Sequence, residues 1–205
     1  VRHGETDWNR ERRIQGSTDI PLNDTGREQA RATGALLSSR RWTALVASPL
    51  SRAAETAKII GEHVGLGDPE LEQRLAERDY GEAEGLTGPE IDAKFPDGAD
   101  VPGREPREAV AERAVAALHD LAARHQGEAV IVVAHGGVIR SVLETVAPGR
   151  HREPITNGSV HSFRHADGEI ELVAFDDPID EQSIFPLADD FEQQNRLAER
   201  EREGR

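Results

Sequence analysis

The sequence predicts an α/β fold: a three-layer α/β/α sandwich with a mostly parallel central sheet and a late antiparallel hairpin. Residues 44–47 (ALVA) and 129–134 (AVIVVA) are apolar runs without polar alternation, as expected of strands that are covered on both faces. Helical periodicity alternates with these runs, which is typical of a parallel sheet between two helix layers. Asp167-Gly168 separates residues 159–164 from residues 170–175 and predicts the hairpin.

Capping residues and apolar spacing predict three long helices. The first begins at Asp24 or Thr25. The second begins with Ser48 as N-cap and Pro49 at the first helical position. The apolar positions at helical spacing are Ala30, Gly34 and Leu37 in the first helix, Ala53, Ala57, Ile60 and Val64 in the second, and Val110, Ala114, Ala117, Leu118 and Leu121 in the third.

The chain is long enough for one α/β domain with a substantial core, and we assign a single catalytic domain to residues 1–175. The strongly acidic residues 176–205 are assigned to a C-terminal extension. We expect a short apolar run upstream of Val1 to complete the first strand. In a parallel sheet, catalytic groups collect at the carboxyl ends of the strands.

A segment rich in Gly, Pro and charge interrupts the domain at residues 81–107. An insert of this kind between core elements is typical of a lid or a specificity loop. Within it we expect one short helix over residues 87–95, because Thr87 and Glu90 have the spacing of a capping box.

Composition excludes several classes of function. The absence of cysteine rules out disulfides, thiolate catalysis and cysteine-ligated zinc. The formal net charge of −14 argues against nucleic-acid binding, which requires a basic surface. No apolar stretch approaches the roughly 18 residues of a membrane span, and no leader precedes the first motif, so we expect a cytoplasmic protein without a membrane partner. An acidic protein that binds a phosphate ester needs a local cluster of arginines.

Four short segments carry the arginines, histidines and carboxylates that could bind a phosphate ester and act on it. They are Arg2-His3-Gly4-Glu5, Ser48-Pro49-Leu50-Ser51-Arg52, Glu77-Arg78-Asp79-Tyr80-Gly81 and His135-Gly136-Gly137. With these motifs in this order, the chain resembles the histidine phosphatase superfamily, which includes the cofactor-dependent phosphoglycerate mutases and broad-specificity phosphatases. The resemblance runs through most of residues 1–175.

The resemblance implies that His3 is a nucleophile that carries a transient phosphoryl group. A neutral imidazole can attack phosphorus and divide the transfer into two displacements. Arg2 and Arg52 would oppose protonation of the ring and bind the phosphoryl oxygens. Arg52 also falls in the first turn of a predicted helix, where free N–H groups favour an anion. By resemblance, His135 is a second catalytic histidine that stabilises charge on the transferring group.

Glu77 is the expected general acid, which protonates the leaving alkoxide and then takes a proton from water. The choice rests on the resemblance of its segment to the acid-bearing segment of the family, and the competing carboxylates are Glu72, Glu82 and Glu84. Further phosphate contacts are expected from Asn9, Gln15, Gly16 and Gly136, and a second anionic contact from Arg104. Arg10, Arg12 and Arg13 form a charged run that we expect to be solvated.

The preferred function is a phosphatase that hydrolyses small phosphomonoesters, with a small phosphorylated metabolite as its partner. A phosphoglycerate mutase is the alternative, but residues 85–107 lack the adjacent arginine pair of the mutases that this chain resembles. A catalytically silent phosphate-binding protein is a further alternative. No metal or cofactor is expected, because His161 and His165 lack a convincing third ligand. The substrate and the oligomeric state, including a homodimer, are left open.

Overall fold

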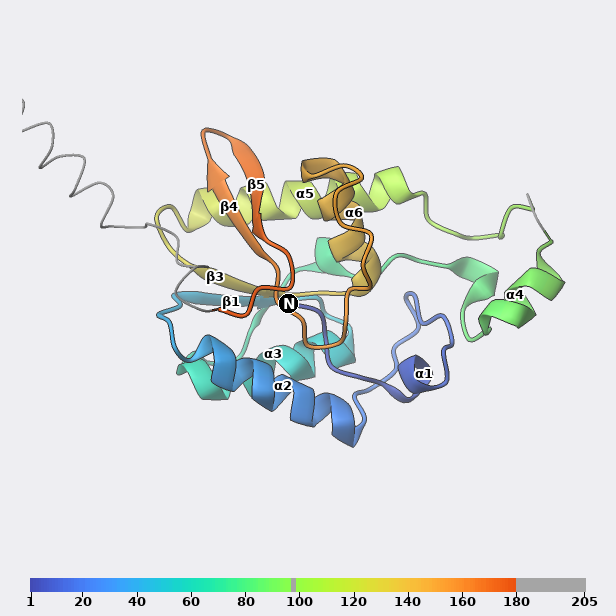
Figure 1. The fold of residues 1–205 in the computed structure, drawn as a ribbon, viewed down its shortest axis with the longest axis horizontal. Helices are drawn as coiled ribbons and strands as arrows, with labels where there is room; N and C mark the ends of the chain where they lie inside the picture. Colours follow the sequence, from blue (N-terminus) through green and yellow to red (C-terminus); the bar gives the residue numbers. More distant parts are fainter. Residues whose placement is uncertain (97–98, 180–205) are drawn as a thin grey trace, which may run out of the picture.

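A parallel sheet lies at the centre of the computed structural model, which describes residues 1–96 and 99–179 (Figure 1). Its strand order is β2-β1-β3, and all pairs are parallel. Ala44 of β1 pairs with Val130 of β3, and the register continues to Ala47 and Val133. The mostly parallel sheet is therefore confirmed. The strands are β1 (Ala44–Ala47), β2 (Glu70–Leu71) and β3 (Val130–Val133).

The first residues of the chain extend this sheet beyond β3. Arg2 forms a parallel bridge with Ala134, and the His3 amide donates to the Ala134 carbonyl at 3.0 Å. On its other side, the Arg2 amide donates to the carbonyl of Ser159 at 3.0 Å. His3 therefore leaves the sheet at its carboxyl end. The apolar run that we expect upstream of Val1 stays a prediction.

Two pairs of helices cover the two faces of the sheet, which confirms the three-layer sandwich (Figure 1). Alternate strand residues point to opposite layers. Leu45, Ala47, Ile131 and Val133 pack with α2 and α3, whereas Val46, Val130 and Val132 pack with α5. The long helices are α2 (Asp24–Leu37), α3 (Ser51–Val64), α5 (Arg107–Arg124) and α6 (Gly136–Val146).

The predicted hairpin is present as a separate two-stranded antiparallel sheet of β4 (Ser162–Ala166) and β5 (Glu169–Ala174). Asp167 and Gly168 form its two-residue turn with φ of 52° and 84°, as such turns require. The first strand begins later than the expected residue 159, because the backbone there pairs with Arg2. The hairpin packs against α6 through Phe163 and Leu172.

Four short helical elements lie in the segments between the long helices and the strands. Thr87 and Glu90 form the expected capping box, and the helix expected over residues 87–95 is α4. Thr6 and Asn9 form a second capping box at α1, which was not predicted. The short elements are α1 (Asp7–Arg10), η1 (Gln73–Leu75), η2 (Gly81–Ala83) and α4 (Gly88–Lys94).

The expected start of the second long helix was wrong. Helix α3 begins at Ser51, and Ser48 is not its N-cap. The Ser48 hydroxyl lies 2.7 Å from Nε2 of His135, while Ser51 N donates to Asp19 Oδ1 at 2.8 Å. A carboxylate from a distant loop therefore occupies the helix start, and the serine is left to bind the histidine.

The described part of the C-terminal extension remains in contact with the core. Asp177 donates its amide to the Val160 carbonyl at 2.7 Å, and Ile179 is 6% exposed within the cluster beneath α2 and α3. Residues 180–205, and with them most of the extension, lie outside the described residues. None of the helices in the described ranges is long and apolar enough to cross a membrane.

Two glycines bring α2 against the segment that follows His3. A Cβ added to Gly26 would lie 2.1 Å from the Glu5 carbonyl oxygen, and one added to Gly4 would lie 2.2 Å from the Gly26 carbonyl oxygen. Both contacts are with backbone atoms, which cannot rotate away. The close approach therefore fixes the course of the chain immediately after His3.

We expect Gly26→Ala to lower the free energy of unfolding by about 2 kcal/mol, because the methyl group forces the two backbones apart. Urea denaturation followed by circular dichroism measures this change. Gly67→Ala is the control, since nothing lies within 4 Å of the corresponding Cβ. Equal stability of the two variants would contradict the proposed close packing.

Candidate active site

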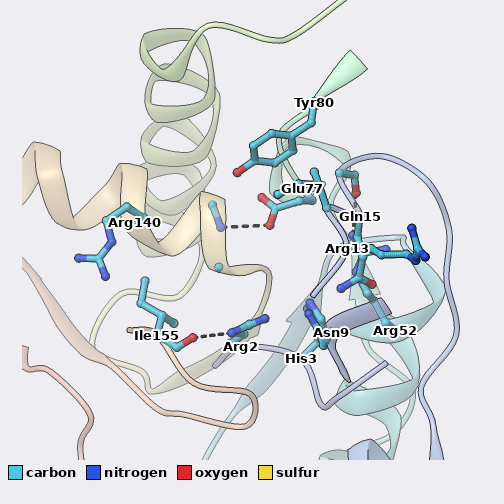
Figure 2. Close-up of a pocket in the computed structure, with 14 residues that line it drawn as sticks. Arg2, His3, Asn9, Arg13, Gln15, Arg52, Glu77, Tyr80, Arg140 and Ile155 are labelled. Carbon is cyan, nitrogen blue, oxygen red and sulfur yellow. Dashed lines mark hydrogen bonds between the residues drawn. The ribbon is translucent and has the colours of Figure 1, made fainter. Parts of the chain in front are cut away.

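A cavity of about 280 Å³ opens where the strands of the sheet end (Figure 2). Except for His135 and Arg104, every residue predicted for the site lines it. They come from distant parts of the sequence: the first segment, α1 and the loop after it, the first turn of α3, the loop after η1 and the start of α6. These lining residues are Arg2, His3, Asn9, Gln15, Gly16, Arg52, Glu77 and Gly136.

His3 is 2% exposed and held in a defined orientation. Its Nδ1 lies 2.7 Å from the Gly4 carbonyl oxygen. Because a carbonyl only accepts hydrogen bonds, Nδ1 carries the proton and Nε2 keeps its lone pair. Burial, together with the charges of Arg2 and Arg52, holds the pKa of His3 well below 6.5. The ring is therefore neutral at physiological pH and can act as a nucleophile.

His135 lies beside His3, with the two ring centroids 5.1 Å apart and the ring planes tilted by 57°. It is fully buried at the N-cap position of α6. Its Nε2 lies 2.7 Å from the Ser48 hydroxyl, while its Nδ1 has no hydrogen-bond partner among the described residues. If the hydroxyl donates to Nε2, Nδ1 carries the proton and is available to an anion. Burial is the largest cause that lowers the pKa of His135 well below 6.5, and the charges of the neighbouring arginines add to it.

Backbone carbonyls, rather than carboxylates, anchor the two central arginines. Arg52 is fully buried and donates to the carbonyls of Thr18 and Gly16 at 2.9 and 2.7 Å. Arg2 donates to the Ile155 carbonyl at 2.5 Å. The Nε atoms of both arginines are buried without a partner among the described residues. Carbonyl anchors fix a guanidinium without neutralising it, so both keep a charged edge for an anion.

Glu77 is the carboxylate that lines the cavity. Its Oε2 accepts from the Gly137 amide at 3.0 Å and its Oε1 from the Arg78 amide at 2.8 Å. Burial raises the pKa of Glu77 above 4.5, although these amides and the arginines Arg52 and Arg2 oppose the shift. A raised pKa lets a carboxyl keep the proton that a general acid must give.

The competing carboxylates have other partners. Glu72 binds Arg74 at 2.8 Å, which lowers the pKa of Glu72 to about 2. Glu82 lies 3.1 Å from the Lys94 ammonium. Glu84 accepts from the Ser17 and Thr18 amides at 2.8 and 2.9 Å and fixes that loop. None of the three lines the cavity in the described structure.

Uncharged hydrogen-bond donors also line the cavity. Asn9 Oδ1 accepts from Asn157 Nδ2 at 3.2 Å, and Gln15 Oε1 accepts from the Thr6 hydroxyl at 2.9 Å. Both amide oxygens are therefore engaged, and both NH₂ groups remain as donors. Gly16, at φ of 56°, presents its carbonyl to Arg52. Gly136 begins α6, where free amides favour an anion.

Arg104 is not brought to the cavity, contrary to the expected second anionic contact. Its side chain is exposed, and its backbone forms a bridge with Tyr80, which itself lines the cavity. Arg13 and Arg140 line the cavity instead, and Figure 2 shows them on opposite sides of Arg2. Arg13, which was expected in a solvated run, also pairs with Glu11 at 2.9 Å. Arg140 lies one helical turn after Gly136, which is the one sequence signal that could have indicated it.

The whole arrangement suits a tetrahedral oxyanion bound to a neutral nucleophile. Arg2 Nε, Arg52 Nε and His135 Nδ1 are the buried side-chain nitrogen and oxygen atoms without a partner in the described part of the chain. Each unsatisfied buried donor costs about 1–3 kcal/mol, so their clustering indicates a ligand rich in acceptors. No group of three or more His, Cys, Asp or Glu residues within residues 1–96 and 99–179 could hold a metal ion.

Comparison with known proteins gives a consistent result. A model of the histidine phosphatase superfamily (branch 1) matches residues 1–178. The chain is 42% identical to the uncharacterized phosphatase PhoE of Bacillus subtilis (strain 168) over 149 residues, which cover 73% of this chain and 76% of that protein. It is 40% identical to phosphoglycerate mutase-like protein 4 of Arabidopsis thaliana over 182 residues, covering 82% and 79%.

The fold is also similar to that of a mycobacterial glucosyl-3-phosphoglycerate phosphatase in complex with VO3. The TM-score is 0.77 at 31% sequence identity, and the match covers 85% of this chain and 95% of that one. Since the family model spans most of the chain and both relatives exceed 30% identity, the chain belongs to the histidine phosphatase superfamily.

Proposed function

We propose that this protein is a phosphatase that hydrolyses small phosphomonoesters through a phosphohistidine on His3. One observation carries the proposal: Arg2 Nε, Arg52 Nε and His135 Nδ1 are buried without a partner in the described part of the chain, the two arginines line the same cavity as His3, and the His135 ring lies 5.1 Å from the His3 ring. Phosphatases among the relatives support hydrolysis as the reaction class.

The first displacement forms a bond between His3 Nε2 and phosphorus and breaks the bond from phosphorus to the ester oxygen. Glu77 gives its proton to that oxygen, and the alcohol leaves. In the second displacement, Glu77 takes a proton from water, the water oxygen bonds to phosphorus, and the bond to His3 breaks. Inorganic phosphate leaves, and both residues return to their starting states.

The residues of the cavity supply the charge that phosphoryl transfer requires. Arg2 and Arg52 stabilise the equatorial oxygens, and His135 adds a neutral donor. No step needs a metal ion for charge neutralisation, so we propose metal-independent turnover. The cavity of about 280 Å³ suits a small phosphorylated metabolite.

We expect the protein to release inorganic phosphate from a generic phosphomonoester in the presence of a chelator, and His3→Ala to reduce the rate by at least about 10³-fold. Phosphate release is the measurement, because a mutase would return the group to the substrate. His119→Ala, which changes a histidine paired with His165 outside the cavity, is the control. Strict metal dependence, or full activity of His3→Ala, would contradict the mechanism.

Glu77→Gln should let a phosphoryl group accumulate on His3 when 4-nitrophenyl phosphate is the substrate. This leaving group needs no proton, but the second displacement still lacks its base. Alkaline quenching followed by mass spectrometry should detect an acid-labile modification of the peptide that contains His3. If the modification lies on another residue, the assignment of the nucleophile is wrong.

The pH profile should reflect the opposite pKa shifts of the two groups. The pKa of His3 is lowered, so its neutral form persists well below pH 6.5. The pKa of Glu77 is raised above 4.5, and the first displacement needs its protonated form. For an alkyl phosphate, kcat/KM should therefore fall as the pH rises through the pKa of Glu77. Glu77→Gln should remove this descending limb, and a limb that survives would belong to another group.

A further inference from the structure

A partly buried guanidinium holds the backbone that carries Glu77. Arg113, on α5, donates through Nη1 to the carbonyls of Arg74 and Ala76 at 2.7 Å each. Its Nη2 lies 3.3 Å from the Glu77 carbonyl oxygen. One side chain therefore fixes three carbonyls within four residues, ending at Glu77 itself.

Glu105 secures the chain on the other side of Glu77. Its carboxylate accepts from Nε and Nη2 of Arg113 at 2.8 and 2.9 Å, and both side chains are only about one-fifth exposed. Its backbone amide donates to the Asp79 carbonyl at 2.8 Å, and its carbonyl accepts from Arg78 Nε at 2.7 Å. A bidentate, partly desolvated pair is stronger and more rigid than a surface ion pair. We call Arg113 and Glu105 together the acid clamp.

We propose that the acid clamp is a positioning device that places the Glu77 carboxyl for proton transfer. The inference rests on the proposed function of Glu77. Neither clamp residue lines the cavity, so neither touches the reacting atoms. With its backbone held by the clamp and its carboxyl by the Gly137 amide, Glu77 has little freedom to leave the site. A displacement of about 1 Å at such a group can cost about 10²-fold in rate.

A positioning role predicts a loss that depends on the leaving group. The ratio kcat/KM reports steps up to the breaking of the ester bond. An alkoxide needs the proton of Glu77 to leave, whereas 4-nitrophenolate does not. For Arg113→Met, we expect kcat/KM to fall at least about tenfold for glycerol 2-phosphate and less than about threefold for 4-nitrophenyl phosphate. The descending limb of the pH profile for the alkyl ester should shift or flatten as well.

The same helix offers a matched control. Arg124 binds Glu70 in a bidentate pair at 2.8 and 3.0 Å, but this pair contacts no part of the Glu77 segment. Arg124→Met should leave kcat/KM unchanged for both substrates. Glu105→Gln removes the ion pair with a smaller change in shape and should give the same selective loss. Because both substitutions break one clamp, the double variant should lose less than the product of the single losses.

Urea denaturation of each variant separates misplacement of the acid from general unfolding. If Arg113→Met does not fold, Glu105→Gln and Arg113→Lys supply the same comparison. Equal losses on both substrates, or no loss on either, would overturn the positioning role. Glu77→Gln, measured beside them, distinguishes failure of the clamp from failure of the proposed role of Glu77 as the acid. If it shows the selective loss and the clamp variants do not, only the clamp is rejected. If it shows none, the role of Glu77 fails and the clamp fails with it.

Discussion

Two arginines with backbone carbonyls in place of carboxylates as hydrogen-bond partners create the condition on which the site depends. Arg52 is fully buried and Arg2 is held beside it, and both are anchored by backbone carbonyls. Removing a guanidinium from water is unfavourable, and carbonyls compensate part of that cost without cancelling the charge. The remaining positive potential adds to the effect of burial in lowering the pKa of His3, and it gives a bound anion its strongest partners. In a chain with net charge −14, this local reversal of sign defines where a phosphate can bind.

The fold provides those carbonyls from segments that are far apart in sequence. Gly16 and Thr18 come from the loop after α1, and Ile155 comes from the loop after α6. Glu84 fixes the first of these loops through the Ser17 and Thr18 amides. The close backbone contact between Gly4 and Gly26 holds the chain after His3. The orientation of two side chains in the site therefore depends on packing across the whole carboxyl edge of the sheet.

Burial moves the two central titrating groups in opposite directions. It disfavours the charged form of each, which lowers the pKa of His3 and raises that of Glu77. The first effect produces a neutral nucleophile and the second a carboxyl that holds its proton, as a paired acid and nucleophile require. Arg113 is partly buried on α5, and its contacts with the carbonyls of Arg74 and Glu77 connect this helix to the segment that carries the carboxyl.

The sequence by itself determined the α/β class, the two core strands, the hairpin turn and most of the residues that line the cavity, because these follow from local periodicity, turn chemistry and short motifs. It failed where a long-range contact decides the outcome. Asp19 occupies the start of α3, so Ser48 binds His135 instead of capping the helix. Arg104 pairs its backbone with Tyr80, which lines the cavity in its place, while Arg140 lines it from α6. The hydrogen bond from Arg113 to the Glu77 carbonyl joins residues 36 positions apart, and no local pattern predicts it. Only the tertiary structure could decide these points, since side-chain partners are set by packing between segments that the sequence separates.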